Sequence, residues 1–217
     1  MNNYHFERLA QKIFVDNIQK LLYNILGALR LLVMKRGIFP INGDVSMSTE
    51  LEIERKFLVE MPDLALLDVR RSAHIRQTYL TNGEGGSQRR VRMVTENGAV
   101  RYIYTEKVFY TAVTRKETEF DISKEEYDRL LEQIRPDCVP IEKDRVCFYY
   151  KEQLFELDAY PFSNELAILE LELGFPDQEI VFPPEISVVK EVTCQEAYSN
   201  ARLANAGAFP PEPEGCE

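Results

Sequence analysis

The segment ELEIERKF, residues 50–57, places a charged side chain at every second position from Glu50 to Lys56. On a helix these charges would spread around the axis, because each residue turns the chain by about 100°. On a strand, alternate side chains point to the same face of the sheet. The segment therefore predicts a strand with one charged face and one mostly apolar face. A solvated surface strand would show the same alternation, so the other strands must decide between a charged surface and a charged interior.

The composition is that of a soluble globular protein and argues against several kinds of partner. Of the 217 residues, 45% are hydrophobic and 29% are charged, and the net charge is −10. This acidic balance argues against a nucleic-acid partner, since binding a phosphate backbone needs clustered basic residues. The four cysteines show no C-x-x-C spacing and only two histidines are present, so no zinc site is expected. We expect reduced thiols in a cytoplasmic protein, and a bound metal would be held by carboxylates, which favours magnesium, manganese or calcium.

Residues 1–46 form a basic, helix-prone leader, whereas the rest of the chain is acidic. The apolar stretch at 21–34 is interrupted by Asn24 and Arg30 and is shorter than the ~20 apolar residues that a membrane-spanning helix needs. We expect the leader to be loosely ordered or not native. A helix that contacts a membrane surface or a partner is the disfavoured alternative. Residues 47–206 then form the main domain, and the Pro- and Glu-rich tail at 207–217 is expected to be disordered.

From residue 47 onward the sequence predicts a mainly β protein of the α+β class. Strands are expected at 50–59, 73–80, 88–95, 100–107, 114–121, 144–150, 153–159 and 167–173. A short helix is expected at 62–69 and a longer one at 123–134. The longer helix begins with a capping box of Ser123 and Glu126, and its apolar stripe should pack on the sheet.

Charges two residues apart recur on nearly every predicted strand. Arg90 and Arg92 share one face of their strand, and Glu170 and Glu172 share one face of theirs. Neighbouring like charges are destabilising unless a ligand lies between them, and unpaired buried charges cannot form a packed core. The pattern fits a closed barrel with a charged lumen and flanking helices. A metal-bound polyphosphate would satisfy both signs of charge.

These charged strands resemble a known family. The E-x-E-x-K pattern of Glu52, Glu54 and Lys56, within EIERKFLV, is similar to the signature of the triphosphate tunnel metalloenzymes, also called the CYTH superfamily. Further matching blocks, spread along the chain as far as Ala204, are IRQTYL (75–80), RRVRM (89–93), Lys107, TRKETEF (114–120), IEKDR (141–145), LFELDAY (154–160), LAILELEL (166–173) and YSNARLA (198–204). The resemblance implies an eight-stranded antiparallel closed β-barrel tunnel that binds a triphosphate with Mg²⁺ or Mn²⁺. It implies hydrolysis of a phosphoanhydride in most members and cyclisation of ATP in a minority.

The resemblance also implies roles for individual residues. Those expected to bind phosphate oxygens are Lys56, Arg90, Arg92, Lys107, Arg115 and Arg145. Those expected to face the metal or its waters are Glu52, Glu54, Glu119, Asp158, Glu170 and Glu172, with Glu117 a weaker candidate. Those expected to act in catalysis are Glu54, Glu170, Lys56 and Tyr79. For Lys143 and Glu156 an outward-facing position and a position in the lumen remain equally open.

Three functions compete for such a site. The favoured one is hydrolysis of inorganic tripolyphosphate, the activity suggested by short bacterial relatives. The second is action on an organic triphosphate, as a thiamine triphosphatase or a class IV-type adenylate cyclase. The third is a non-catalytic polyphosphate-binding module, against which the set of glutamates argues. In each case the partner is a small-molecule triphosphate, and a homodimer remains open.

Overall fold

The computed structural model describes residues 48–109, 114–175 and 178–211, and of the side chains of residues 48–52, 109, 114 and 115 nothing is stated. The chain divides into two compact units, of which the first joins Met1–Asp44 with Gly174–Gln178 and lies almost wholly outside the described residues. The leader expected at 1–46 thus also lies outside them. The following description concerns the second unit. Within the described residues, no helix is long and apolar enough to cross a membrane.

The described strands form one antiparallel sheet. Their bounds are β1 Ser48–Glu60, β2 Val69–Leu80, β3 Gln88–Glu96, β4 Ala99–Phe109, β5 Thr114–Ile122, β6 Ile141–Tyr150, β7 Gln153–Ala159, β8 Leu166–Leu173 and β9 Val188–Glu191. All the strands expected from the alternation of side chains are present, and most extend a few residues further than predicted. The exception to the expectation is β9, a short strand that the sequence pattern did not indicate.

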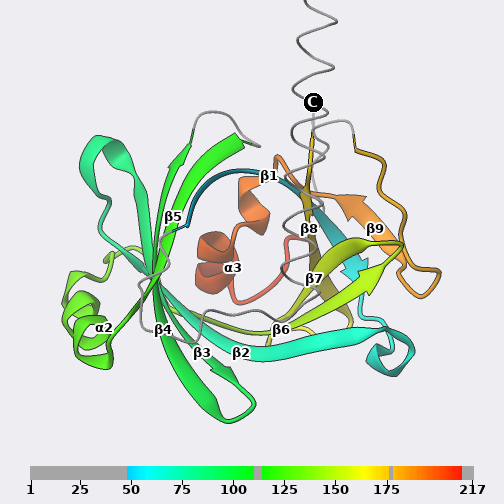
Figure 1. Cartoon of the computed structure of the whole chain (residues 1–217), viewed down its shortest axis with the longest axis horizontal. Helices are drawn as coiled ribbons and strands as arrows, with labels where there is room; N and C mark the ends of the chain where they lie inside the picture. The colour runs from blue at the N-terminus through cyan, green and yellow to red at the C-terminus, as the bar shows by residue number, and fades with distance from the viewer. Residues whose placement is uncertain (1–47, 110–113, 176–177, 212–217) are drawn as a thin grey trace, which may run out of the picture. The chain divides into compact units, whose positions relative to one another are not determined.

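The strands β1 to β8 close into a ring. Neighbouring strands follow the order β5-β4-β3-β2-β6-β7-β8-β1-β9, and β1 also pairs with β5. Two stretches of β1 make this closure: residues Ser48 to Ile53 pair with β5, and residues Ile53 to Glu60 pair with β8. Figure 1 shows the strands arranged around the position of α3 in this view. The prediction of a mainly antiparallel β fold with a closed ring of eight strands is therefore confirmed.

Apolar side chains on the outer face of the ring form the main core. Phe57, Phe148 and Phe155 are at most 4% exposed and come from β1, β6 and β7. The segment before β9 covers them, with Ile186 buried and Phe182 packed against Phe57 at a ring-centroid distance of 5.0 Å. Because these residues alternate with charged ones along their strands, packing of the outer face turns the charges to the inner face.

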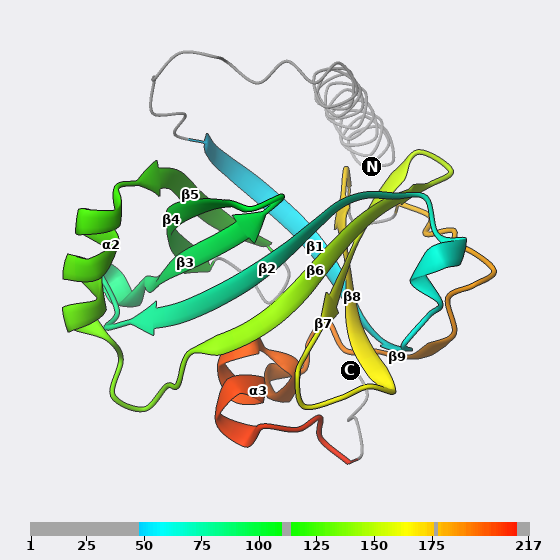
Figure 2. The same ribbon diagram turned by 90° about the horizontal axis from the view of Figure 1, so that it is seen from below.

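A helix covers another part of the outer face. The helix α2, Lys124–Leu130, continues as a 3-10 turn over Leu131–Gln133, close to the predicted range. The Ser123 hydroxyl accepts a hydrogen bond from the Glu126 N–H at 3.1 Å, as expected of an N-cap. Tyr127 and Leu130 are buried in a cluster with residues of β2 and β3. Figure 2 shows α2 beside the ends of these strands.

The helix expected at 62–69 is wrong in extent. Only Leu64–Leu66 is helical, as one 3-10 turn, and Val69 already begins β2 opposite Phe148. Leu66 is 64% exposed, and the turn Leu64–Leu66 contains no buried residue that would support a longer helix.

One end of the inner face is apolar and is covered by the end of the chain. Leu58 of β1 and Ile168 of β8 pack with Tyr198 and with Leu203 of α3, Asn200–Ala206. Figure 2 shows α3 at one end of the ring. Phe209, which lies in the tail predicted at 207–217, packs against this cluster. Residues 212–217 lie outside the described part of the chain.

Candidate active site

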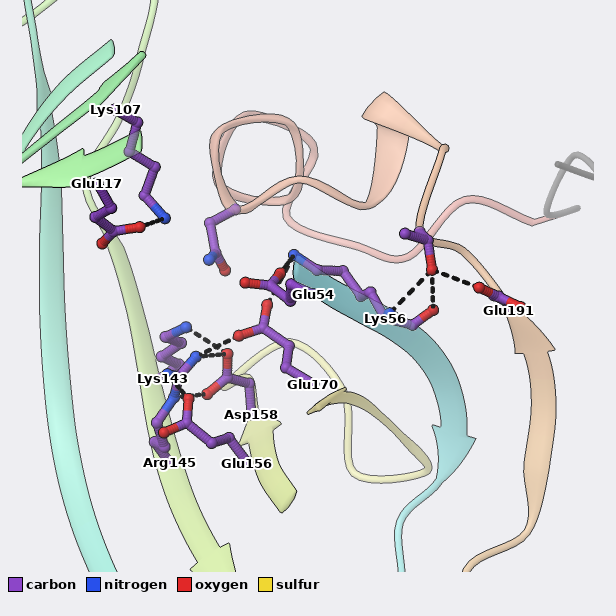
Figure 3. Close-up of polar contacts among 12 residues, drawn as sticks. Glu54, Lys56, Lys107, Glu117, Lys143, Arg145, Glu156, Asp158, Glu170 and Glu191 are labelled. Atoms are coloured by element: carbon purple, nitrogen blue, oxygen red, sulfur yellow. Dashed lines mark hydrogen bonds and ion pairs between the residues drawn. The ribbon is translucent and has the colours of Figure 1, made fainter. Parts of the chain in front are cut away.

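The strand that carries the E-x-E-x-K pattern meets an acidic strand across the ladder. In the register of β1 and β8, Lys56 lies opposite Glu170 and Glu54 lies opposite Glu172. Residues opposite one another in an antiparallel pair share a face, so these four lie on the inner face. The Lys56 Nζ lies 2.7 Å from a Glu170 carboxylate oxygen and 3.4 Å from one of Glu54 (Figure 3). The lysine thus joins two carboxylates predicted to act in catalysis.

Arg145 connects this pair to the neighbouring strands β6 and β7. Its guanidinium donates to both carboxylate oxygens of Asp158, at 2.6 and 2.7 Å, and to Glu170 at 2.7 Å. It also donates to Glu156. Asp158 is fully buried and bonds Lys143 as well, whose side chain is only 2% exposed. The question left open for Lys143 and Glu156 is thereby answered, since both take part in this inner-face network (Figure 3).

The expected basic residues of β3 and β4 form a second network with β5. Glu117 accepts from Arg90 at 3.1 Å and forms an ion pair with Lys107 at 2.5 Å. Glu119 pairs with Arg92 and accepts a hydrogen bond of 3.2 Å from the Thr105 hydroxyl. Glu117 and Glu119 therefore form ion pairs with basic side chains in this structure, as do Glu54 and Glu170.

Two arginines of β3 have unused hydrogen-bonding capacity. Among the described residues, the buried Nε atoms of Arg90 and Arg92 have no hydrogen-bond partner. A buried donor without a partner costs free energy, commonly about 1–3 kcal/mol. Guanidinium groups whose Nε–H has no partner can donate hydrogen bonds to an anion with several oxygens, such as a phosphate chain.

Tyr79 lies on the same face, opposite Arg90 in the register of β2 and β3. It is 4% exposed, and its hydroxyl accepts a hydrogen bond of 2.9 Å from the Gln77 side-chain amide. Burial raises the pKa of the Tyr79 hydroxyl above its ordinary value, although Arg90 and Lys56 act in the opposite direction. The hydroxyl is therefore a neutral donor at neutral pH.

Burial and neighbouring charges also change the protonation of two charged groups. Burial, together with the positive charge of Arg145, lowers the pKa of Lys143 to about 8, although Asp158 and Glu170 act in the opposite direction. For Glu170, burial favours the neutral acid, but Lys56 and Arg145 outweigh it and hold its pKa well below the ordinary range. Glu170 is thus ionised at neutral pH, whereas Lys143 titrates near pH 8.

Two of the predicted site residues lie beyond what the structure describes. The side chains of Glu52 and Arg115 fall outside the described residues, although the backbone register places the two residues opposite each other in β1 and β5. Glu172 is exposed and lies opposite Glu54. Because the Glu172 side chain near the end of β8 is exposed, it is accessible to a ligand that enters from solvent.

No group of three or more His, Cys, Asp or Glu side chains in the described part of the chain is arranged to hold a metal ion. The donor chemistry nonetheless fits Mg²⁺ or Mn²⁺, because Glu54, Glu170 and Glu172 offer carboxylate oxygens on adjacent strands. Glu54 and Glu170 are at present bound to Lys56. An anion that takes over Lys56 would break these two ion pairs, and Glu170 would keep its hydrogen bond from Arg145.

The sequence left one inner-face residue undecided and missed another. Lys143 is spaced two residues from Arg145, the same signal that identified Arg90 and Arg92, but its face was left open. Thr105 carries no charge and gave no signal, yet it bonds Glu119. Uncharged residues of this kind are recognised only once the register of neighbouring strands is known.

Comparisons with known proteins place this site in a family. The crystal structure of the inorganic triphosphatase NE1496 shares 30% sequence identity with this chain and covers 71% of this chain and 94% of that one, with a TM-score of 0.45. A second structure of NE1496, described as a hypothetical protein, gives 29% identity over 73% and 99% of the two chains, also with a TM-score of 0.45. The PH1819 protein from Pyrococcus horikoshii OT3 shares 19% identity over 55% of this chain and 77% of its own, with a TM-score of 0.45.

A scan against models of protein families gave no match, and a search among curated proteins gave none either. The sequence shared with NE1496 over nearly its whole length, rather than the TM-score, carries the assignment. It agrees with the closed ring of strands and with the charged residues on its inner face. The chain belongs to the triphosphate tunnel metalloenzymes, the CYTH superfamily.

Proposed function

We propose that this protein hydrolyses inorganic tripolyphosphate to pyrophosphate and phosphate, with Mg²⁺ or Mn²⁺, by in-line attack of water. The observation that supports it most directly is the set of buried and partly buried basic side chains on the inner face of the ring. Those with described side chains are Lys56, Arg90, Arg92, Lys107, Lys143 and Arg145. Together they can neutralise a triphosphate of about four negative charges, and the arginines can make bidentate contacts with its oxygens.

The substrate class is supported by the relative, which is described as an inorganic triphosphatase. A tripolyphosphate needs only cations and hydrogen-bond donors along its length, and these are what the described inner face offers. The apolar cluster of Leu58, Ile168 and Leu203 covers one end of this face, so the chain of phosphates would enter from the other end.

Substrate binding would proceed by exchange of ion pairs. Phosphate oxygens would replace Glu170 at Lys56 and Glu117 at Arg90, where the arginine already has an unpartnered Nε. The carboxylates that lose these partners would still be buried or half-buried and would need a compensating charge. A divalent cation held by Glu54, Glu170 and Glu172 would supply that charge and would draw electron density from the phosphate oxygens during bond cleavage.

The residues of β1 would carry out the proton chemistry. Glu54 is only partly buried, and its carboxylate would orient the attacking water and accept its proton. Lys56 would hold an oxygen of the phosphorus under attack and stabilise the charge that develops on it. Tyr79, a neutral donor opposite Arg90, would donate a hydrogen bond to the phosphate chain.

The test is release of phosphate by the full chain from tripolyphosphate, ATP, thiamine triphosphate and pyrophosphate, each with Mg²⁺, with Mn²⁺ and with EDTA. The proposal requires metal-dependent turnover that is fastest with tripolyphosphate. Faster turnover of thiamine triphosphate, or formation of cyclic AMP from ATP, would replace it with one of the organic substrates. Binding of tripolyphosphate without turnover of any substrate would identify a polyphosphate-binding module.

A further inference from the structure

The strand that carries Lys56 changes its partner next to the active site. On one side, β1 pairs with β5 as far as Ile53, and its pairing with β9 begins at Phe57. Glu54 and Lys56 lie between these two stretches. This part of β1 therefore needs other hydrogen-bonding partners on that side to hold its backbone in place.

The segment that follows β9 supplies those partners for Lys56. The Lys56 N–H donates to the Thr193 hydroxyl at 3.0 Å, and the Val192 N–H donates to the Lys56 carbonyl at 2.8 Å. A threonine side chain thus takes the place of the carbonyl that a continuous strand would offer. Figure 3 shows the Lys56 side chain extending toward Glu170, with Glu191 on the other side of the Lys56 backbone.

The Thr193 hydroxyl is itself oriented by a carboxylate. It donates to Glu191 at 2.7 Å, and since a hydroxyl has a single hydrogen, its lone pairs are left for the Lys56 N–H. Arg55 holds Glu191 through two hydrogen bonds of 2.8 and 2.5 Å. The hydrogen bond from Arg55, assisted by that from Thr193, lowers the pKa of Glu191, so this carboxylate remains an acceptor at neutral pH.

We propose that Thr193, oriented by Glu191, is a positioning residue that sets where Lys56 presents its ammonium group. The inference rests on the proposed hydrolysis of tripolyphosphate. Lys56 has its backbone tied to Thr193 and its Nζ 2.7 Å from Glu170, so a shift of this backbone moves the ammonium relative to the phosphate. Many basic side chains contribute to substrate affinity, whereas the rate depends on how the Lys56 ammonium is aligned with the phosphate. A displacement of the order of 1 Å can lower a rate by about 100-fold.

The experiment compares Thr193→Val, which keeps the shape and removes the hydroxyl, with Thr193→Ser, which keeps the hydroxyl. We expect kcat for tripolyphosphate to fall about tenfold or more in the valine variant, with KM changed less than about threefold, and to recover in the serine variant. Ser163→Ala is the matched control, because the Ser163 hydroxyl also accepts a hydrogen bond from a backbone N–H, that of Leu166 at 3.0 Å, in a loop that carries none of the residues assigned to the candidate site. Its kcat should equal that of the unchanged protein.

A second readout does not depend on turnover. Hydrogen exchange at the Lys56 amide should be faster in Thr193→Val than in the unchanged protein or in Thr193→Ser, because the acceptor of this amide is lost. If Thr193→Val does not fold, Glu191→Gln at the half-exposed partner provides the same comparison, with a smaller fall in kcat and faster exchange at Lys56.

The outcomes separate the two proposals. If the unchanged protein hydrolyses no triphosphate, the proposed function fails, and exchange at Lys56 still decides whether Thr193 holds this backbone. If the unchanged protein is active and Thr193→Val keeps its kcat, or Thr193→Ser loses as much as Thr193→Val, the positioning role is overturned. Unchanged exchange at the Lys56 amide in Thr193→Val would overturn it as well.

Discussion

Lys143 and Asp158 form an ion pair from which solvent is excluded: the lysine side chain is 2% exposed and the aspartate side chain is not exposed at all. Arg145 binds the same carboxylate, so two cations share Asp158. Burial, assisted by the positive charge of Arg145, lowers the pKa of Lys143 to about 8, while the Arg145 guanidinium stays charged. The network is therefore sensitive to pH just above neutrality.

The first prediction concerns this sensitivity. The affinity of the unchanged protein for tripolyphosphate should fall as the pH rises through about 8, because the lowered pKa lets Lys143 lose its proton there, and a bound anion requires the proton back. In Lys143→Arg the side chain stays charged. The affinity of the unchanged protein divided by that of Lys143→Arg should therefore fall by up to about tenfold per pH unit above 8. Calorimetric titrations from pH 7 to 9.5 measure this ratio, in which the titration of the ligand itself cancels. A constant ratio would show that Lys143 does not contact the phosphates.

The second prediction separates catalysis from binding at Glu54. Replacing this carboxylate by the amide in Glu54→Gln removes the proposed proton acceptor but keeps the side-chain shape. We expect kcat to fall about 100-fold or more while tripolyphosphate still binds, because removal of a negative charge beside Lys56 does not weaken the hold on an anion. The control is Glu142→Gln on β6, where the side chain is 49% exposed and lies 3.9 Å from Arg76. Turnover by Glu54→Gln at the unchanged rate would exclude Glu54 as the base.

The third prediction concerns stability and the charge of Glu170. Its folded-state pKa is depressed by Lys56 and Arg145, so its contribution to stability is present above the ordinary value of 4.5 and is lost as the pH falls through the folded-state value. Glu170→Gln should therefore lower the free energy of unfolding by about 2 kcal/mol at pH 7. The difference from the unchanged protein should shrink below pH 4.5. Urea unfolding at pH 7, 5 and 4 tests this, and a difference that does not vary with pH would mean that packing, not charge, is the cause.

The fourth prediction uses two adjacent arginines that lie on opposite faces of β3. Arg90 belongs to the inner-face network and has an unpartnered Nε, whereas Arg89 donates to the Tyr104 hydroxyl at 2.9 Å on the outer face. Arg90→Lys loses the fork of donors and should raise KM for tripolyphosphate about tenfold. Arg89→Lys, the same chemical change one residue away, should leave KM unaltered. Equal effects of the two substitutions would indicate a change in the fold of β3 rather than a lost contact with phosphate.

Much of the site was predictable because strands repeat every two residues. The alternation that begins at Glu50 indicated which residues share a face, and the structure brings Lys56, Arg90 and Arg145 to the inner face as expected. Helix lengths were less predictable. At 62–69 the local sequence allows a helix, but Val69 is already part of β2, and pairing with β6 decides the outcome.

The sequence by itself determined the strands, their charged face and the residue types available to a triphosphate, since all of these depend on alternation along a single strand. Only the tertiary structure decided which charges meet. Arg145 and Glu170 are separated by 25 positions, and Lys56 and Thr193 by 137. The first contact depends on the order of β6, β7 and β8 in the sheet, and the second on the segment that follows the short strand β9, which sequence alternation did not indicate. The physical reason is that alternation defines the face of a residue but not its register against a distant strand, which is determined by packing of the whole ring.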